Sequence, residues 1–387
     1  MTALAPLAEL AELAALDLDG LLAGKKIVVC CGSGGVGKTT TAAALALRAA
    51  ERGRKVVVVT IDPARRLAQS LGVVELGNAP ARVPGAGAGG GELHAMMLDM
   101  KRTFDDIVLT HAEPERAQQI LDNPFYVMLS ANLAGTQEYM AMEKLGQLHA
   151  TGEWDLIVVD TPPTRSALDF LDAPDRMTRF LDGRFLRVVL TPAKVGGRFG
   201  ARLVNVGINT FSGVIVKITG AELLRDLRDF FAAFETMFGG FRDRAKETYR
   251  LLQHRDTAFV VVASPDPPAL REAAYFVERL STERMPLACV VVNRVHRVAA
   301  TQVSAERAVA TAEVLAERGV RGPAAGLLRL YADRVALAAA ERRSIRAFAA
   351  GQADVPLVEV PAMATDVHDV AGLRRIGAEL AGGEAAA

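Results

Sequence analysis

Eight residues near the N-terminus combine glycines, a lysine and a threonine at the spacing of a phosphate-binding loop. The segment reads Gly32-Ser33-Gly34-Gly35-Val36-Gly37-Lys38-Thr39, which fits the pattern GxxxxGK[ST], and Thr40 follows it. Such a loop needs glycines because its backbone N–H groups turn inward around phosphate oxygens, where a Cβ atom would obstruct them. The lysine can reach the β and γ phosphates, and the hydroxyl after it can hold magnesium. We therefore expect these residues to bind ATP with Mg²⁺.

The neighbours of this segment favour a phosphate-binding loop over a glycine-rich turn with an incidental lysine. Residues 26–31 form a short apolar run typical of a buried strand, and an alanine-rich stretch from Thr39 to about Arg52 is typical of a helix. A helix that begins at the loop adds its partial positive charge next to the phosphates. The order strand, loop, helix is the context in which this motif binds nucleotides.

Two aspartates each follow a predicted strand, Asp62 in the first third of the chain and Asp160 further on. Both carboxylates are expected at the carboxyl edge of a parallel sheet, where open α/β folds bind their ligands. Asp160 is the candidate magnesium ligand that would act together with Thr39. Two interpretations of Asp62 stay open. It orients or deprotonates the attacking water, or it caps the turn at Pro63.

Short apolar runs rich in valine and isoleucine recur along the chain and alternate with helical stretches. This alternation predicts an α/β fold with a doubly wound, mostly parallel sheet and helices on both faces. The predicted strands are 26–31, 56–61, 156–159, 187–190, 259–262, 289–292 and 357–360. We expect an N-terminal extension over residues 1–23 and one ATPase domain over 24–387, with helical additions at 101–148 and 193–250.

Two segments interrupt the alternation. Residues 77–91 contain many glycines and few large side chains, which predicts a mobile surface loop that tolerates change and lies outside the site. Within the second helical addition, leucine, phenylalanine and methionine recur at helical spacing from Leu223 to Phe241. This stripe either packs against the rest of the domain or lines a groove for an apolar helix of a client protein.

Composition limits the classes of partner and compartment. Lysine plus arginine and aspartate plus glutamate number 45 each, so no global positive field exists for nucleic acid or an acidic membrane surface. The three cysteines, Cys30, Cys31 and Cys289, lie in apolar runs without CxxC spacing, which fits buried thiols in a reducing cytoplasm. We also expect no membrane-spanning segment and no export signal, because apolar runs are short and the N-terminus lacks a basic lead.

As a set, the motifs resemble those of the arsenite-pump and tail-anchored-protein-targeting ATPases, the ArsA/Get3 family. This family has a deviant phosphate loop and belongs with MinD, ParA and the nitrogenase iron protein. The matching pieces run in the family's order from about Lys25 to about Leu380. They are GSGGVGKTT, TIDPARRLAQSLG, NLAGTQEYMAMEKL around Glu138, WDLIVVDTPPT, ASPDPPALREAAYFVERL, VVNR and the closing Val360-Pro361-Ala362-Met363. We expect the chain to belong to the bacterial branch of the family.

The resemblance implies a dimeric switch that closes over ATP and couples its hydrolysis to the handling or targeting of hydrophobic or membrane client proteins. It implies a cytoplasmic protein, or one peripheral to the membrane, whose partner is a second copy or a paralogous ATPase. It further implies that Asp62 positions water and that Asn293 and Pro361 contact adenine. The alternatives are an ATPase subunit that energises an anion transporter and a low-activity nucleotide-binding scaffold in a heterodimer.

The chain also departs from the family pattern. In the family, the phosphate loop usually carries a second lysine that reaches the partner's phosphates. Ser33 occupies that position here. We therefore expect slow hydrolysis, or pairing with a paralogue that carries the lysine. The Gly-His of the second switch is Arg165-Ser166. The zinc-binding CxxC of the eukaryotic targeting factors is missing, as is a cysteine cluster for trivalent arsenic, and this argues against an arsenite pump.

Overall fold

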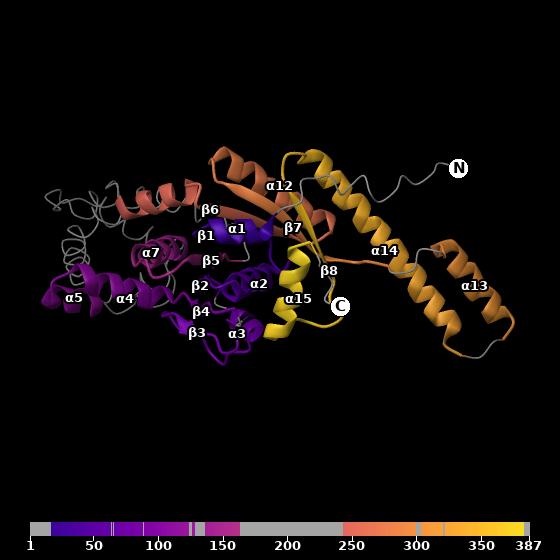
Figure 1. The fold of residues 1–387 in the computed structure, drawn as a ribbon, viewed down its shortest axis with the longest axis horizontal. Coiled ribbons are helices and arrows are strands. Elements are labelled where there is room, and N and C mark those ends of the chain that lie inside the picture. Colours follow the sequence, from indigo (N-terminus) through magenta and orange to yellow (C-terminus); the bar gives the residue numbers. More distant parts are fainter. Residues whose placement is uncertain are drawn as a thin grey trace, which may run out of the picture. The chain divides into compact units, whose positions relative to one another are not determined.

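The computed structural model describes residues 17–162, except 63, 65, 88, 124–125 and 128–135, together with 243–298, 303–319 and 322–382. The chain divides into two compact units. The first comprises Met1–Leu98, Gln147–Leu168 and Arg250–Ala387, and the second comprises Asp99–Gly146 and Asp169–Tyr249. Figure 1 labels the elements and colours them along the sequence.

An eight-stranded sheet forms the centre of the first unit. Its strands are β1 Ile27–Gly32, β2 Lys55–Thr60, β3 Ala81–Arg82, β4 Glu92–Met97, β5 Leu156–Asp160, β6 Thr257–Ala263, β7 Leu287–Val295 and β8 Leu357–Pro361. They lie in the order β3-β4-β2-β5-β1-β6-β7-β8, and all pairs are parallel except β3 with β4. Every residue of β1, β5 and β6 is buried because helices cover both faces of the sheet. The predicted doubly wound α/β fold is confirmed.

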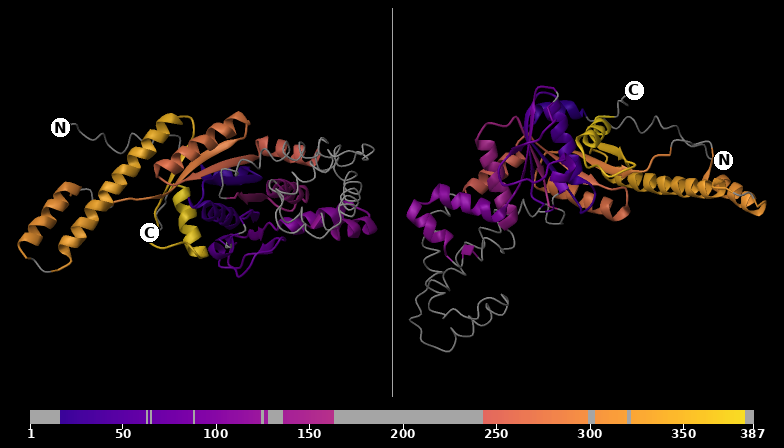
Figure 2. Two further views of the ribbon diagram at one scale, coloured as in Figure 1. Left: turned by 180° about the vertical axis from the view of Figure 1, so that it is seen from behind. Right: turned by 90° about the horizontal axis from the view of Figure 1, so that it is seen from below.

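The first unit's helices are α1 Leu18–Gly24, α2 Lys38–Glu51, α3 Arg66–Leu71, α12 Pro267–Thr282, α13 Ala305–Glu317, α14 Ala324–Gly351 and α15 Val370–Leu380. From β1 the chain winds toward β2, and from β6 it winds toward β7 in the opposite direction along the sheet. Right-handed connections therefore put α2 and α12 on opposite faces. Helices α1, α3 and α15 pack against α2, and α14 packs against α12 (Figures 1 and 2).

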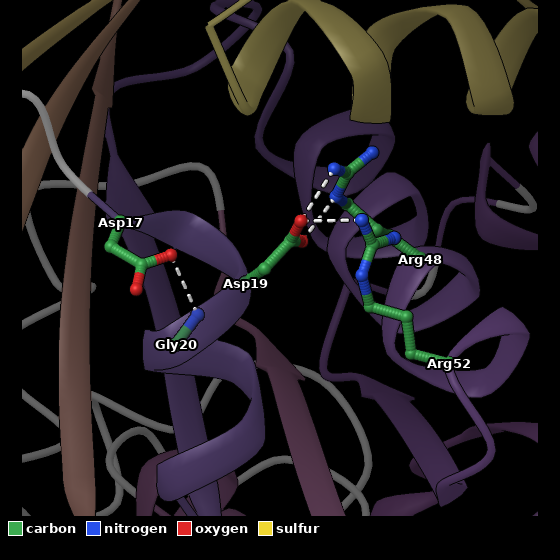
Figure 3. Close-up of polar contacts among 5 residues, drawn as sticks. All are labelled: Asp17, Asp19, Gly20, Arg48 and Arg52. Carbon is green, nitrogen blue, oxygen red and sulfur yellow. Dashed lines mark hydrogen bonds and ion pairs between the residues drawn. The ribbon is translucent and has the colours of Figure 1, made fainter.

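A cluster of ion pairs fastens α1 to α2 (Figure 3). The Asp17 carboxylate accepts a hydrogen bond from the Gly20 N–H at 2.8 Å and so caps α1. The Asp19 carboxylate accepts a hydrogen bond from Arg48 Nε at 2.6 Å and also contacts the guanidinium of Arg52. The hydrogen bond from Arg48 holds the pKa of Asp19 below its usual range, although partial burial opposes this effect. Helix α1 is thereby held against the core of the first unit.

Much of the glycine-rich segment 77–91 is exposed, as predicted for a surface segment, but the predicted tolerance to change is wrong where the segment packs against the sheet. It contains β3 and buries Val83, which is 1% exposed. A Cβ atom on Gly89 would lie 1.7 Å from the carbonyl oxygen of Glu51 at the end of α2. Glycine is required there because two backbones approach each other closely. The next strand, β4, escapes prediction because it lacks β-branched residues.

The second unit is helical in its described part. It contains α4 Met100–His111, α5 Pro114–Leu121, the first part of α7 Thr136–Ala150, and helical residues 243–249. Within it, the buried carboxylate of Glu143 accepts a charged hydrogen bond from Arg244 Nε at 2.8 Å. Three predicted features lie outside the described residues: the strand at 187–190, Arg165-Ser166 and the stripe from Leu223 to Phe241.

The crossover from β7 to β8 is a hairpin of two helices that the sequence pattern does not predict. Helix α13 lies along the N-terminal half of α14 (Figure 1). Small side chains allow this close packing, since α13 buries Ala308 and Ala312 and α14 buries Ala332. Among the described helices of both units, none combines the length and the hydropathy needed to cross a bilayer.

Candidate functional site

The carboxyl ends of neighbouring parallel strands bring the predicted site residues to one edge of the sheet. Strand β1 ends at Gly32, β2 at Thr60, β5 at Asp160 and β8 at Pro361, while Asn293 lies near the end of β7. Strand β1 lies between β5 and β6, where the winding direction reverses. Open α/β sheets bind their ligands outside the strand ends at such a switch point.

Two glycines of the phosphate-loop motif occupy positions that a larger residue could not. Gly32 has a φ of 148°, and a Cβ atom on it would lie 2.1 Å from the carbonyl oxygen of Val262 in β6. Gly37 has a φ of 98° and directly precedes α2. A Cβ atom on Gly37 would lie 2.2 Å from Asn293 Nδ2. Between them, Gly34 and Gly35 are exposed, so the middle of the loop is open to a ligand.

Lys38, Thr39 and Thr40 form the first turn of α2. Lys38 is 5% exposed, and its Nζ donates a hydrogen bond to the carbonyl oxygen of Ser33 at 2.8 Å. Burial lowers the pKa of Lys38, and the negative charge of Asp160 opposes this effect. The ammonium group forms no ion pair with any described carboxylate, so its charge is available to an anion bound in the loop.

Asp160 is a buried carboxylate held by two threonine hydroxyls. Its Oδ2 accepts hydrogen bonds from Thr39 Oγ1 at 2.7 Å and from Thr60 Oγ1 at 2.8 Å. The residue is 0% exposed, and its Oδ1 has no hydrogen-bond partner within the described chain. Burial raises the pKa of Asp160 to about 6, although the hydrogen bonds from Thr39 and Thr60 oppose the rise. An unpaired carboxylate oxygen beside a hydroxyl fits Mg²⁺, which prefers hard oxygen ligands.

Asp62 caps a turn in this structure. Its Oδ1 accepts a hydrogen bond from the Ala64 N–H at 2.9 Å, and its Oδ2 lies 3.8 Å from a terminal nitrogen of Arg66. Its own N–H donates to Thr60 Oγ1 at 3.2 Å. Thr60 therefore connects Asp62 to Asp160, a role that the motifs do not reveal. The signal was present in the sequence, since a hydroxyl at the end of a strand stands two residues before an aspartate. Positioning of water by Asp62 stays a hypothesis.

Strand β7 donates two side-chain hydrogen bonds to carbonyl groups of the phosphate loop. Asn293 Nδ2 donates to the carbonyl oxygen of Val36 at 2.9 Å, and a terminal nitrogen of Arg294 donates to that of Gly35 at 3.0 Å. Arg294 has a φ of 63°, which is uncommon for a residue other than glycine. It was not predicted as a site residue, although the motif VVNR contains it. Pro361 lies at the end of the neighbouring strand β8.

A pH dependence of stability follows from the raised pKa of Asp160. A carboxyl group whose pKa rises on folding destabilises the folded protein at pH values above that pKa, and the cost disappears below the pKa of the unfolded chain. Replacing Asp160 by Asn removes the charge and keeps an oxygen for the threonine hydroxyls. We compare the free energies of unfolding of Asp160→Asn and wild type without nucleotide. We expect the variant's value minus the wild-type value to rise by on the order of 2 kcal/mol as the pH rises from about 4 to about 8. Urea unfolding of both proteins measures this difference, and a difference that does not change with pH would contradict it.

A family of known proteins matches most of the chain. The family described as "Anion-transporting ATPase" matches residues 25–310 of the 387. The chain is 27% identical to "ATPase get3" of Schizosaccharomyces japonicus over 270 residues, which cover 68% of this chain and 72% of that protein. It is 26% identical to "ATPase get3" of Schizosaccharomyces pombe over 270 residues, 68% of this chain and 71% of that protein.

A "Putative arsenical pump-driving ATPase" of Prosthecochloris vibrioformis is 29% identical over 157 residues, which cover 40% of this chain and 36% of that protein. The expected placement in the bacterial branch has no support, because several of the most similar relatives come from eukaryotes. The predicted family itself is confirmed, because the match covers the strand, loop and helix of the site and most of the sheet. The chain belongs to the ArsA/Get3 family of ATPases.

Proposed function

We propose that this ATPase is a switch that couples ATP binding and hydrolysis to the handling or targeting of hydrophobic or membrane client proteins. The main support for a nucleotide-driven switch is the buried carboxylate of Asp160. Its unpaired oxygen lies in the same site as Thr39 and the ammonium group of Lys38. Resemblance to the tail-anchored-protein-targeting ATPases supports the choice of client. The same nucleotide chemistry would serve any client whose binding differs between the ATP and ADP states.

In the proposed site, backbone N–H groups from Gly32 to Thr40 bind the phosphates of ATP, and Lys38 adds its positive charge. Lys38 now donates to the neutral carbonyl of Ser33, and a phosphate oxygen is the stronger acceptor. Thr39 and Asp160 would hold Mg²⁺, which neutralises negative charge on the transferring phosphate. The threonine hydroxyls fix the Asp160 side chain, so its unpaired oxygen is positioned before the ion arrives.

Asp62 is the proposed group that positions water for in-line attack on the γ phosphate. Its carboxylate now accepts the Ala64 N–H, and it would exchange that hydrogen bond for one from water. Its link through Thr60 to Asp160 provides a route by which the metal site and the turn at Asp62 would respond to each other. Asn293 and Pro361, at the ends of adjacent strands, are the proposed contacts to adenine.

The proposed partner is a second copy of the chain or a paralogous ATPase. Ser33 stands where the family's loop carries the lysine that reaches the partner's phosphates, so a homodimer lacks two positive charges at its nucleotides. This feature favours slow hydrolysis, and it supports a second candidate function. The chain would then be a low-activity nucleotide-binding scaffold in a heterodimer whose paralogue supplies the lysine.

The cysteines argue against energising an arsenite transporter. All three are free and fully buried, and burial raises the pKa of Cys31 and of Cys289 to about 12. Trivalent arsenic requires accessible thiolate ligands, which these residues do not provide. Free thiols also fit the reducing cytoplasm, where we propose that the protein works. Any contact with a membrane would then be peripheral.

Variants of Lys38 and Asp62 distinguish a role in ATP binding from a role in hydrolysis. We expect Lys38→Ala to weaken ATP binding and to lower turnover by about a hundredfold or more, because a phosphate charge loses its counter-ion. We expect Asp62→Asn to keep ATP binding but to lower turnover by about a hundredfold, because water loses its positioning group. Calorimetry and a phosphate-release assay measure the two effects. Lys55→Ala is the matched control, since Lys55 begins β2 at the opposite edge of the sheet. Turnover equal to wild type in both site variants would contradict the proposed roles.

The missing second lysine can be restored. Ser33 is partly exposed in the loop, so a longer side chain can extend from it. If the missing charge limits hydrolysis, Ser33→Lys should raise turnover of the purified chain by about tenfold or more. Ser33→Met has similar length without the charge and should not raise it. Equal rates in wild type and both variants, with ATP binding intact, would show that this position does not limit hydrolysis.

The client is tested by capture in the trapped state. Asp62→Asn should accumulate the ATP-bound form, and tagged full-length protein purified from its own cells with Mg-ATP is then analysed by mass spectrometry. We expect enrichment of proteins with a single apolar segment long enough to span a bilayer, relative to Lys38→Ala purified in parallel. Enrichment of a paralogous ATPase alone would favour the scaffold, and equal recovery from both variants would contradict client handling.

A further inference from the structure

Helix α14 exposes large apolar side chains along one line of its surface. Leu327, Leu330 and Leu337 are 60%, 65% and 42% exposed. They are three and seven residues apart, so they lie on one face of the helix, and we call them the leucine stripe. Further along α14, Ile345 and Phe348 are buried in the first unit. The stripe therefore belongs to the half of α14 that lies beside α13.

The stripe has the spacing of a helix that pairs with another helix. Positions 327, 330, 334 and 337 follow the alternating steps of three and four residues that form the seam of a coiled coil. Three of the four are leucine and the fourth is Arg334, with Asp333 next to it. Neither Asp333 nor Arg334 forms an ion pair with another described residue, so both charges are available to a partner.

The charges indicate what kind of partner fits. A wholly apolar helix, such as a membrane-spanning client segment, would bury Arg334 without a counter-charge, which is strongly unfavourable. A partner must therefore offer leucine-sized side chains around a negative charge. A second copy of α14 in the antiparallel direction meets this requirement, because a two-fold interface matches a surface with itself. Leu327 then faces the partner copy's position 337, and Arg334 lies within one turn of the partner copy's position 333.

We propose that two copies of this chain associate through the leucine stripe, with their α14 helices packed antiparallel. This deepens the dimer of the proposed function by naming its surface. Most of the surface lies outside the family match, because α14 begins at Ala324 and the match ends at residue 310. Helix α14, which carries this surface, is also linked to the nucleotide site.

Two contacts fasten α14 to the strand that holds the phosphate loop. The backbone N–H of His296 donates to Glu341 Oε2 at 2.8 Å, and His296 Nδ1 lies 2.7 Å from Glu341 Oε1. His296 is three residues after Asn293, which bonds to the loop at Val36. Pairing of the two α14 helices would therefore constrain β7 and the loop carbonyl that it contacts.

Sedimentation of the full-length chain, with and without Mg-ATP, tests the proposal. We expect wild type to form a dimer, and Leu330→Glu to weaken its dissociation constant by about tenfold or more, since a charge replaces a central apolar contact. Leu109→Glu is the matched control, because Leu109 is 59% exposed on α4 in the second unit. Circular dichroism checks that both variants fold.

Calorimetry with Mg-ATP separates this proposal from the nucleotide site, because Leu330→Glu keeps every residue of that site and should still bind nucleotide. A monomeric wild type under both conditions, or a dimer that Leu330→Glu leaves unchanged, would overturn the proposal.

A charge exchange tests the antiparallel arrangement. Asp333→Arg and Arg334→Asp each place like charges together across the interface, so each should weaken dimerisation. The double variant restores opposite charges and should recover it, and an equimolar mixture of the two single variants should form a mixed dimer. Sedimentation of all four samples gives the result. A double variant as weak as the single variants would overturn the antiparallel pairing.

Discussion

The site depends on a carboxylate that is kept out of water at the end of a central strand. Asp160 is buried, and one of its oxygens accepts two threonine hydroxyls while the other has no described partner. Burying a charge in this way is costly, and its pKa rises as a result. The proposed Mg²⁺ would compensate this cost, so stability without ligand would be exchanged for affinity with it. The hydroxyls come from Thr39 in α2 and Thr60 in β2, so this carboxylate ties the end of β2 to the helix that follows the phosphate loop.

The surrounding fold holds that carboxylate and the loop in register. Helix α2 begins at the loop and packs its alanines against the sheet, so the backbone can come close to β1. On the other side, β7 bonds to two loop carbonyls through Asn293 and Arg294. The same strand leads through His296 into the hairpin. Nucleotide site and hairpin are therefore joined by a short, hydrogen-bonded segment, through which the proposed pairing of α14 helices would act on the loop.

Periodicity and motif spacing predict the parts of the structure that depend on local sequence. Valine-rich runs mark the central strands because parallel strands are buried on both faces, and the loop glycines follow from backbone geometry. Contacts between distant segments are harder. Thr60 meets Asp160 across 100 residues of sequence, because β2 and β5 become neighbours only in the folded sheet. Gly89 looked like part of a free loop, yet its backbone lies against Glu51. In the hairpin, α13 and α14 pack closely through short alanine side chains. This packing does not need the periodic large apolar residues from which a helix pair is usually predicted.

The central claim is that loop amides, Lys38, Thr39 and Asp160 form one site for a nucleotide and its metal ion. Calorimetric titration of the folded wild-type protein with ADP, with and without Mg²⁺, tests this claim most directly. We expect measurable heat of binding with Mg²⁺ and an affinity that falls by about tenfold or more when the ion is removed. Absence of any binding heat with Mg-ADP or Mg-ATP, for the chain alone or mixed with a paralogous ATPase, would contradict it.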